Sequence, residues 1–200
     1  CIIYRKTFQE MIFRFDDVCV NSDMELHNQL TDYLFEKFPK CEIIWAVSPL
    51  VHSSEKETQR VFPKEWNALS AFQNHYFLDK MGIPAIHPKV RVATHGLCHV
   101  DHRLLSIEAQ EMSIAISASL VGAKIFVPPF NKWNKDTEKA CGYMKLIKYE
   151  HGWRSMEHNK YTSKQWRCGE NGKSYLDQQW YLHAREWTIE SFKAWFENGS

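Results

Sequence analysis

Short apolar runs alternate along the chain with longer segments whose apolar residues recur at the three-and-four spacing of a helix. The apolar runs, which are typical of buried strands, occupy residues 11–15, 41–47, 90–94, 124–127, 145–149 and 179–183. Helices are predicted from 22 to 38, over 66–81, from 106 onward, over 134–143 and from 188 onward. This alternation predicts an α/β fold with a largely parallel sheet. For two hundred residues it favours an (α/β) barrel, complete or incomplete, over an open sheet.

Local signals set the expected ends of these elements. Ser22, with Glu25 three residues later, has the pattern of a capping box at the start of the first helix, and Pro39 ends that helix. Ser106 and Thr188 are expected to cap later helices. A polar loop is expected over 48–63. Residues 150–178 show the least regular pattern, with a hairpin turn predicted at Asn-Gly 171–172.

The composition is that of one globular domain, which we expect to span residues 1–200. Apolar residues make up 44% of the chain, including eight Trp and twelve Phe, and this is enough for a sizeable core. The formal charge of +1, without a basic stripe, argues against nucleic acid as a partner. Six scattered Cys without a CxxC pair indicate free thiols in a reducing compartment.

Membrane and targeting signals are absent from the pattern. No run of 18 apolar residues predicts a transmembrane helix. No signal peptide is visible, so a cytoplasmic location is expected. The chain begins with Cys rather than Met, which leaves a missing N-terminal piece open, and the pattern leaves the oligomeric state open as well.

Four residues that follow two of the predicted strands carry the candidate chemistry. Asp16 and Asp17 come directly after the first apolar run, and His95 and His99 follow the third. Strand ends are where α/β folds gather their reactive groups. One Asp and two His suit a catalytic zinc site, which has three protein ligands and an open position. Asp17, His95 and His99 are therefore expected to bind a divalent metal, and Asp16 is left to act as a base.

Two later segments end predicted strands in ways that add to this site. The run 126–131 ends in a diproline followed by Phe130 and Asn131, and the run 179–183 ends in His183. Rings and polar groups beyond these strands are candidates for contact with a substrate: Phe130, Asn131, Trp133 and Arg185, with Trp153, Tyr161 and Trp166 as further rings that could stack on a sugar.

Taken in order, these segments resemble the polysaccharide deacetylases, a carbohydrate esterase family that shares the nodulation-type chitooligosaccharide deacetylase domain. The family's T-F-D-D-G motif corresponds to R-F-D-D-V at 14–18, and its H-[ST]-x-x-H motif to H-G-L-C-H at 95–99. Its R-x-P-[YF] motif corresponds to V-P-P-F at 127–130. Its last motif, a strand ending in L-x-H, corresponds to Y-L-H at 181–183. The resemblance covers nearly the whole chain.

The resemblance implies a distorted (β/α) barrel with the site at the carboxyl ends of the strands. It also implies a divalent metal, usually zinc, and hydrolysis of an N-acetyl or O-acetyl group on a sugar. In this interpretation Asp16 takes a proton from water and His183 protonates the departing amine. A backbone N–H near Phe130 helps to hold the oxyanion.

Three departures from the family pattern mark a divergent member. Val18 replaces the glycine of the first motif, and Gly96 replaces the Ser or Thr of the second. The third motif lacks its arginine, which in the family helps to hold the catalytic Asp. Arg185, two residues past His183, is a possible replacement on the same side of the chain.

Other interpretations remain open at this point. The same metal water could act on a non-carbohydrate amide or ester. A carbohydrate-binding or scaffold protein on a catalytically degenerate barrel is favoured by the lost arginine, although the retained Asp16 argues against it. A purely structural zinc site is disfavoured, because closed sites prefer four ligands rich in Cys.

Overall fold

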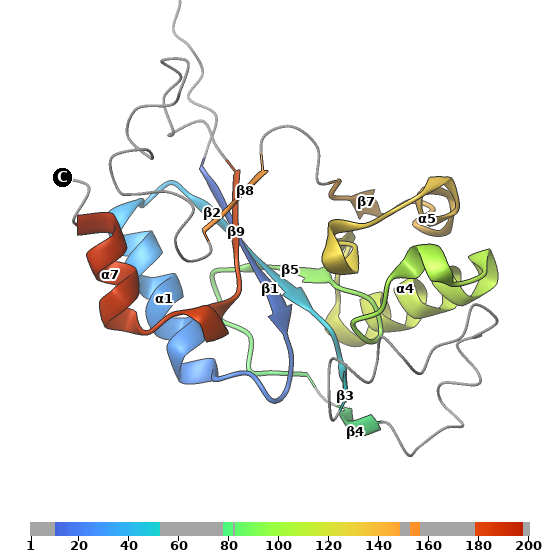
Figure 1. The fold of residues 1–200 in the computed structure, drawn as a ribbon, viewed down its shortest axis with the longest axis horizontal. Coiled ribbons are helices and arrows are strands. Elements are labelled where there is room, and N and C mark those ends of the chain that lie inside the picture. The colour runs from blue at the N-terminus through green and yellow to red at the C-terminus, as the bar shows by residue number, and fades with distance from the viewer. Residues whose placement is uncertain (1–10, 53–77, 82, 149–152, 157–178, 198–200) are drawn as a thin grey trace, which may run out of the picture.

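The computed structural model describes residues 11–52, 78–81, 83–148, 153–156 and 179–197 (Figure 1). The strands in this part of the chain are β1 (Ile12–Val18), β2 (Glu42–Val47), β3 (Leu50–His52), β4 (Leu78–Met81), β5 (Arg91–Thr94), β6 (Ile125–Phe126), β7 (Lys145–Leu146), β8 (Trp153–Ser155) and β9 (Gln179–Leu182). The α-helices are α1 (Met24–Lys37), α4 (Ile107–Val121), α5 (Lys135–Ala140) and α7 (Ile189–Glu197). Short 3-10 turns are η2 (His102–Leu104), η3 (Pro129–Asn131) and η5 (Ala184–Glu186).

Seven strands form one sheet in the order β7-β6-β5-β2-β1-β9-β8, and every pairing in it is parallel. A short antiparallel pair, β3 with β4, lies apart from this sheet. The carboxyl ends of β1, β5, β6 and β9 therefore reach one edge of the sheet. This edge is where the residues of the predicted site are found.

Helices cover the outer face of the sheet on two sides. In Figure 1, α1 and α7 lie side by side against the part of the sheet that contains β1, β2 and β9, while α4 and α5 lie near β5, β6 and β7. The largest core cluster fills the space under α1 and α7. It contains Phe13 and Phe15 of β1 packed against Leu30, Phe192 and Phe196, all buried to within 1% exposure.

Alternation along β1 separates this core from the inner face of the curled sheet. Because successive side chains of a strand point to opposite faces, Phe13 and Phe15 point to the helices, and Arg14 and Asp16 point inward. The inner face is lined by a second apolar cluster: Ile44, Ala46, Ala93, Ile125, Val127, Ile147 and Trp153, with Ile12 and Tyr181 against it. A charged pair is thus embedded in a small apolar interior.

Most predicted elements are confirmed. The apolar runs form β1, β2, β5, β6, β7 and β9, and the helices that were expected after 22, 106, 134 and 188 are present. Ser106 caps α4 by accepting a hydrogen bond from Ala109, and Thr188 accepts one from Ser191. The described cysteines are free thiols. Among the described helices, none is both long and apolar enough to cross a membrane.

Four local predictions are wrong. Asp23, not Ser22, caps α1: its carboxylate accepts from the Leu26 amide, while the Ser22 hydroxyl accepts from the Cys19 amide. Leu78–Met81, expected to end a helix, is strand β4, and the loop predicted from 48 contains its partner β3. Strand β8 lies in the segment that was expected to be irregular. The remainder of the 66–81 helix and the 171–172 turn lie outside the described residues.

Candidate active site

The backbone at the end of β1 turns both adjacent carboxylates toward one region. Asp17 has a φ of 60°, in the left-handed region, and the register of β1 with β2 shifts between Phe15 and Val18. Asp is one of the few residues other than Gly that visit this conformation. The turn breaks the strict alternation of the strand, so Asp16 and Asp17 line the same cleft.

His95 is held by the ends of β2 and β6, the two strands that flank β5. Its amide donates to the carbonyl of Val47 at 2.8 Å, and its ring Nδ1 lies 2.7 Å from the carbonyl oxygen of Val127. A carbonyl oxygen only accepts, so Nδ1 carries a proton, and Nε2 is the ring nitrogen that faces Asp17. This is the usual second contact of a metal-binding histidine.

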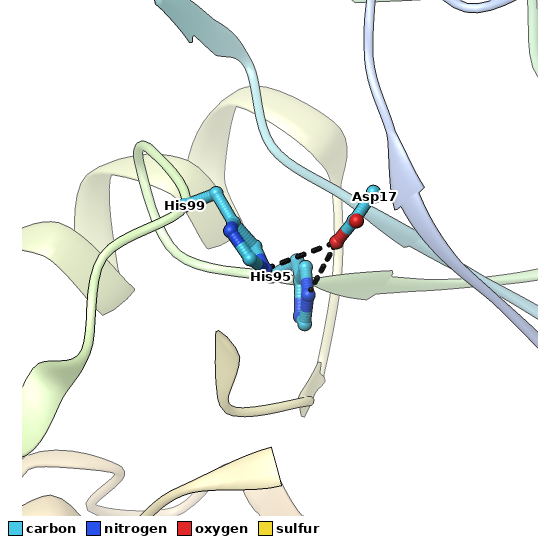
Figure 2. A group of neighbouring side chains, drawn as sticks. All are labelled: Asp17, His95 and His99. Atoms are coloured by element: carbon cyan, nitrogen blue, oxygen red, sulfur yellow. Dashed lines mark ion pairs between the residues drawn. The ribbon is translucent and has the colours of Figure 1, made fainter. Parts of the chain in front are cut away.

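His99 completes a group of three side chains that point toward one another in Figure 2. Asp17 Oδ1 lies 3.3 Å from His95 Nε2 and 3.0 Å from His99 Nε2. One ligand atom from each residue falls within 4.8 Å of the others. Despite these distances, Asp17 Oδ1 accepts no hydrogen bond of acceptable geometry from the described residues. A buried, unsatisfied carboxylate oxygen close to two imidazole nitrogens is an arrangement that suits a shared cation.

This donor set fits a divalent metal. It offers one carboxylate oxygen and two imidazole nitrogens, which is the composition of an open, three-ligand zinc site. Burial raises the pKa of Asp17, but the His95 and His99 rings outweigh burial and hold that pKa well below its usual range. The ligand carboxylate is therefore ionised near neutral pH.

The loop between the two histidines depends on Gly96 and a buried third histidine. Gly96 has a φ of +80°, and a Cβ added there would lie 2.6 Å from Cε1 of His102. The His102 ring donates from Nδ1 to the carbonyl of Val100 at 3.0 Å, and its Nε2 lies 3.1 Å from the Ser113 hydroxyl. Burial lowers the pKa of His102 to about 4, so this ring is a neutral packing group behind the metal-site loop.

Asp16 differs from Asp17 in every contact. Arg14 Nε donates to Asp16 Oδ1 at 2.7 Å, and Arg14 Nη2 donates to Asp16 Oδ2 at 2.6 Å. Arg14 Nη2 also lies 2.6 Å from Asn131 Oδ1. Because an arginine engages both oxygens of Asp16, the adjacent Asp17 is the carboxylate left to face the two histidines.

The other carboxylate oxygen of Asp17, Oδ2, lies near His183 and Arg185. His183 follows β9, and Arg185 lies in the turn η5. His183 Nε2 lies 3.5 Å and Arg185 Nη2 lies 3.1 Å from Asp17 Oδ2. Arg185, suggested as a replacement for the third-motif arginine, therefore contacts Asp17 and not Asp16. In this structure the arginine on Asp16 is Arg14.

These side chains surround a cleft of about 410 Å³, lined by Asp16, Asp17, His95, His99, Phe130, Asn131, Lys132, Tyr181, His183 and Arg185. A second hollow of about 210 Å³ adjoins it on the α1 side and shares Asp16, Asp17, His183 and Arg185. Of the residues predicted for the site that the structure describes, all but Trp133 and Trp153 meet here, and Tyr161 and Trp166 lie outside the described residues. Trp133 does not line the cleft, and its ring packs against Lys148 instead.

Sequence reasoning missed three of the residues around the site. Lys132 and Tyr181 line the cleft, and Arg14 lies behind it. The signal for Arg14 is its place two residues before Asp16 in a strand, which puts both side chains on one face.

The comparisons with known proteins concern the fold that carries this site. No protein-family model and no curated protein matches the chain. Among solved structures, the chain is similar to a peptidoglycan N-acetylglucosamine deacetylase, with 11% identity and a TM-score of 0.52 over 96% of this chain and 81% of that one. It is equally similar, at 11% identity and a TM-score of 0.52, to a carbohydrate esterase family 4 pseudoenzyme from Bacillus anthracis, over 96% of this chain and 60% of that one.

A peptidoglycan deacetylase from Bacillus subtilis also matches, with 12% identity and a TM-score of 0.47 over 96% of this chain and 86% of that one. At such identities a likeness defines the fold alone. The fold is that of the family 4 carbohydrate esterases, so the predicted distorted (β/α) barrel of the polysaccharide deacetylase type is confirmed. One neighbour with this fold is named a pseudoenzyme, so activity has to be argued from the residues of the site.

Proposed function

We propose that this protein is a metal-dependent hydrolase that removes an acetyl group, N-linked or O-linked, from an acetylated sugar or glycan. The observation that carries the proposal is the meeting, in one cleft, of a metal-type donor set with a second carboxylate and a further histidine. Asp17, His95 and His99 form the donor set, and Asp16 and His183 are the additional groups. A structural metal site has no use for the last two.

Asp17, His95 and His99 would hold the metal, and their mixed oxygen and nitrogen donors favour zinc. When bound, such an ion supplies Lewis acidity, polarising the acyl carbonyl and lowering the pKa of water toward about 7. The Val127 carbonyl fixes the tautomer of His95, which keeps Nε2 available as a ligand.

Asp16 serves as the general base that accepts a proton from the attacking water. Its carboxylate is buried to 4% exposure yet lines the cleft, and each oxygen keeps a second lone pair after pairing with Arg14. His183, one-fifth exposed on the same cleft, donates a proton to the departing amine or alkoxide. A backbone N–H near Phe130 helps to hold the oxyanion.

Substrate contacts are assigned to the rim of the cleft. The Phe130 ring packs on His99 with centroids 4.3 Å apart, and Phe130 has a φ of 58° in the turn that follows β6. Phe130 and Tyr181 are the described aromatic rings that line the cleft, and they are suited to stacking on a sugar. Asn131 and Arg185 lie on the same rim.

The experiment that tests the proposal has a metal arm and an acetate arm. Metal content is measured by elemental analysis after reconstitution with zinc, for the wild type, for His99→Ala and for His87→Ala. The last is the matched control, because His87 pairs with Asp32 away from the site. We expect close to one equivalent in the wild type and control, and little in His99→Ala.

Acetate release is then measured from N-acetylglucosamine oligomers and from small acetylated amides, for the wild type and Asp16→Asn. We expect release from the sugar, with the rate in Asp16→Asn strongly reduced and its metal content kept. Release from small amides alone would instead indicate a non-carbohydrate amidase. Bound metal without any release would refute the proposal and favour a binding protein on an inactive barrel.

A further inference from the structure

Arg14 is the most deeply buried charge that the described residues contain near the cleft. Its side chain is 0% exposed on the inner face of β1, and it is surrounded by the apolar cluster of the barrel interior. Burying a guanidinium is costly unless its charge and donors are matched. An arginine buried in this position needs a partner of opposite charge that also accepts its hydrogen bonds. The identity of that partner indicates the role of the arginine.

The principal partner is Asp16, to which Arg14 donates two parallel hydrogen bonds. The contacts Nε to Oδ1 at 2.7 Å and Nη2 to Oδ2 at 2.6 Å form the planar, two-pronged pairing in which arginine fixes both the position and the rotation of a carboxylate. A lysine could supply the charge but not the orientation.

The guanidinium is in turn held from three other elements. Its Cζ lies 4.5 Å from the ring centroid of Trp153 in β8 and 5.3 Å from that of Tyr181 in β9. Asn131 Oδ1, from η3, accepts from Nη2 at 2.6 Å. Asn131 and the preceding Phe130 have φ values of 55° and 58°, so this turn is shaped to bring the Asn131 amide to the arginine.

We propose that Arg14 is the positioning residue for Asp16: it holds the carboxylate in a fixed rotation toward the cleft and keeps it away from the metal ligands. This inference rests on the proposed function, in which Asp16 is the base. The arginine comes from the same strand as the base, two residues earlier, whereas position 127, where the resembling family has its arginine, is Val in this chain. Asn131, whose Oδ1 accepts from Arg14 Nη2, then helps to hold the arginine in place.

The test compares Arg14→Ala, Arg14→Lys and a control, Arg91→Ala. Arg91 is an exposed arginine at the start of β5 that pairs with Glu42, so its removal is the same chemical change outside the site. Each variant is measured for metal content, for kcat and KM of acetate release, and for rescue by millimolar guanidinium chloride against the same concentration of sodium chloride.

We expect Arg14→Ala to keep its metal and its KM while kcat falls by about a hundredfold, the order of loss that misplacement by about 1 Å causes. Guanidinium, which fits the space that the side chain leaves, restores at least tenfold of this loss, and sodium chloride restores none. Arg14→Lys retains the positive charge but lacks the two-pronged guanidinium, so its kcat should also be well below that of the wild type. Arg91→Ala behaves as the wild type.

Three outcomes would overturn the inference. One is an unchanged kcat in Arg14→Ala. Another is loss of metal in step with kcat, which would make Arg14 part of the metal site. The third applies if Arg14→Ala does not fold: Arg14→Lys is then the test variant, and a wild-type kcat in that variant would overturn the inference. Failure of the wild type to release acetate at all would be different, because it would remove the proposed function and this inference with it.

Discussion

Replacing Gly96 by Ser would restore the residue type of the resembling family motif, and we expect it to destabilise this protein. Gly96 has a φ of +80°, and its missing Cβ would lie 2.6 Å from Cε1 and 3.1 Å from Nε2 of His102. The His102 ring cannot move aside easily, because Val100 and Ser113 hold its two nitrogens. The glycine and the buried histidine are thus a matched pair.

The expected cost has two parts. An L-residue in the left-handed region costs roughly 1–2 kcal/mol. Forcing additional atoms into a packed interior costs typically about 1–3 kcal/mol. Together these give a loss of about 2–5 kcal/mol in the free energy of unfolding, which is a large fraction of the roughly 5–15 kcal/mol that a native domain has.

The assay is urea unfolding, with a control that separates the two parts. Gly122, at the C-terminal cap of α4, has a φ of +67° and open space around its missing Cβ. Gly122→Ser therefore pays only for the backbone, and it should lose roughly 1–2 kcal/mol. The double variant Gly96→Ser with His102→Ala removes the clash and should recover about 1–3 kcal/mol relative to additivity.

Two results would refute this reasoning. Equal destabilisation by Gly96→Ser and Gly122→Ser would mean that the His102 ring does not limit the loop. Additive losses in the double variant would mean that the two positions are not coupled.

Three further predictions concern single side chains. The pKa of His102 is about 4 in the fold against 6.5 for an ordinary histidine, so the unfolded chain binds more protons between these values. Lowering the pH from 7 to 5 should therefore remove about 2 kcal/mol of stability through this group, and urea unfolding of His102→Gln should show a correspondingly smaller loss. Burial raises the pKa of Cys98 to about 12, so peptide mapping after alkylation should find it unmodified in the folded protein while the half-buried Cys19 reacts; equal labelling would contradict this. Asp17→Asn, which keeps a residue tolerant of a positive φ, should weaken zinc binding by more than about a hundredfold in a chelator competition, since outer-shell changes alone cost roughly 10–100-fold.

The strands and helices that the sequence predicts correctly are those with strong local signals. Strands β1, β2 and β5 are apolar runs, and α4 begins at a serine whose hydroxyl accepts from the first turn. The errors fall where non-local contacts decide. Leu78–Met81 becomes a strand because it pairs with Leu50–His52 far earlier in the chain, and β8 exists because it pairs with β9. Neither pairing can be recognised from the local spacing of apolar residues.

The cluster of Asp17, His95 and His99 could be predicted because these residues lie at or just after the ends of strands. In the structure those strand ends lie at one edge of the sheet. Spacing placed His95 and His99 on one loop, and parallel topology brings Asp17 to them. The partner of Asp16 was not predicted. The family motif has its arginine at the position of Val127, whereas the alternation of Phe13, Arg14, Phe15 and Asp16 already places an arginine on the same face as Asp16.

The two adjacent carboxylates have different surroundings because of one backbone feature. In a regular strand, neighbours point to opposite faces, and Asp17 would lie with Phe15 in the core under α1. The positive φ of Asp17 turns it back toward His95 and His99, while Asp16 stays in register with Arg14 on the inner face. Arg14 pairs with both oxygens of Asp16, whereas two imidazoles face Asp17 Oδ1, so the proposed division into base and ligand follows from the turn at the end of β1. A substitution that replaced the positive φ at position 17 with regular strand geometry would turn this side chain away from His95 and His99. It would affect the Arg14–Asp16 pair less.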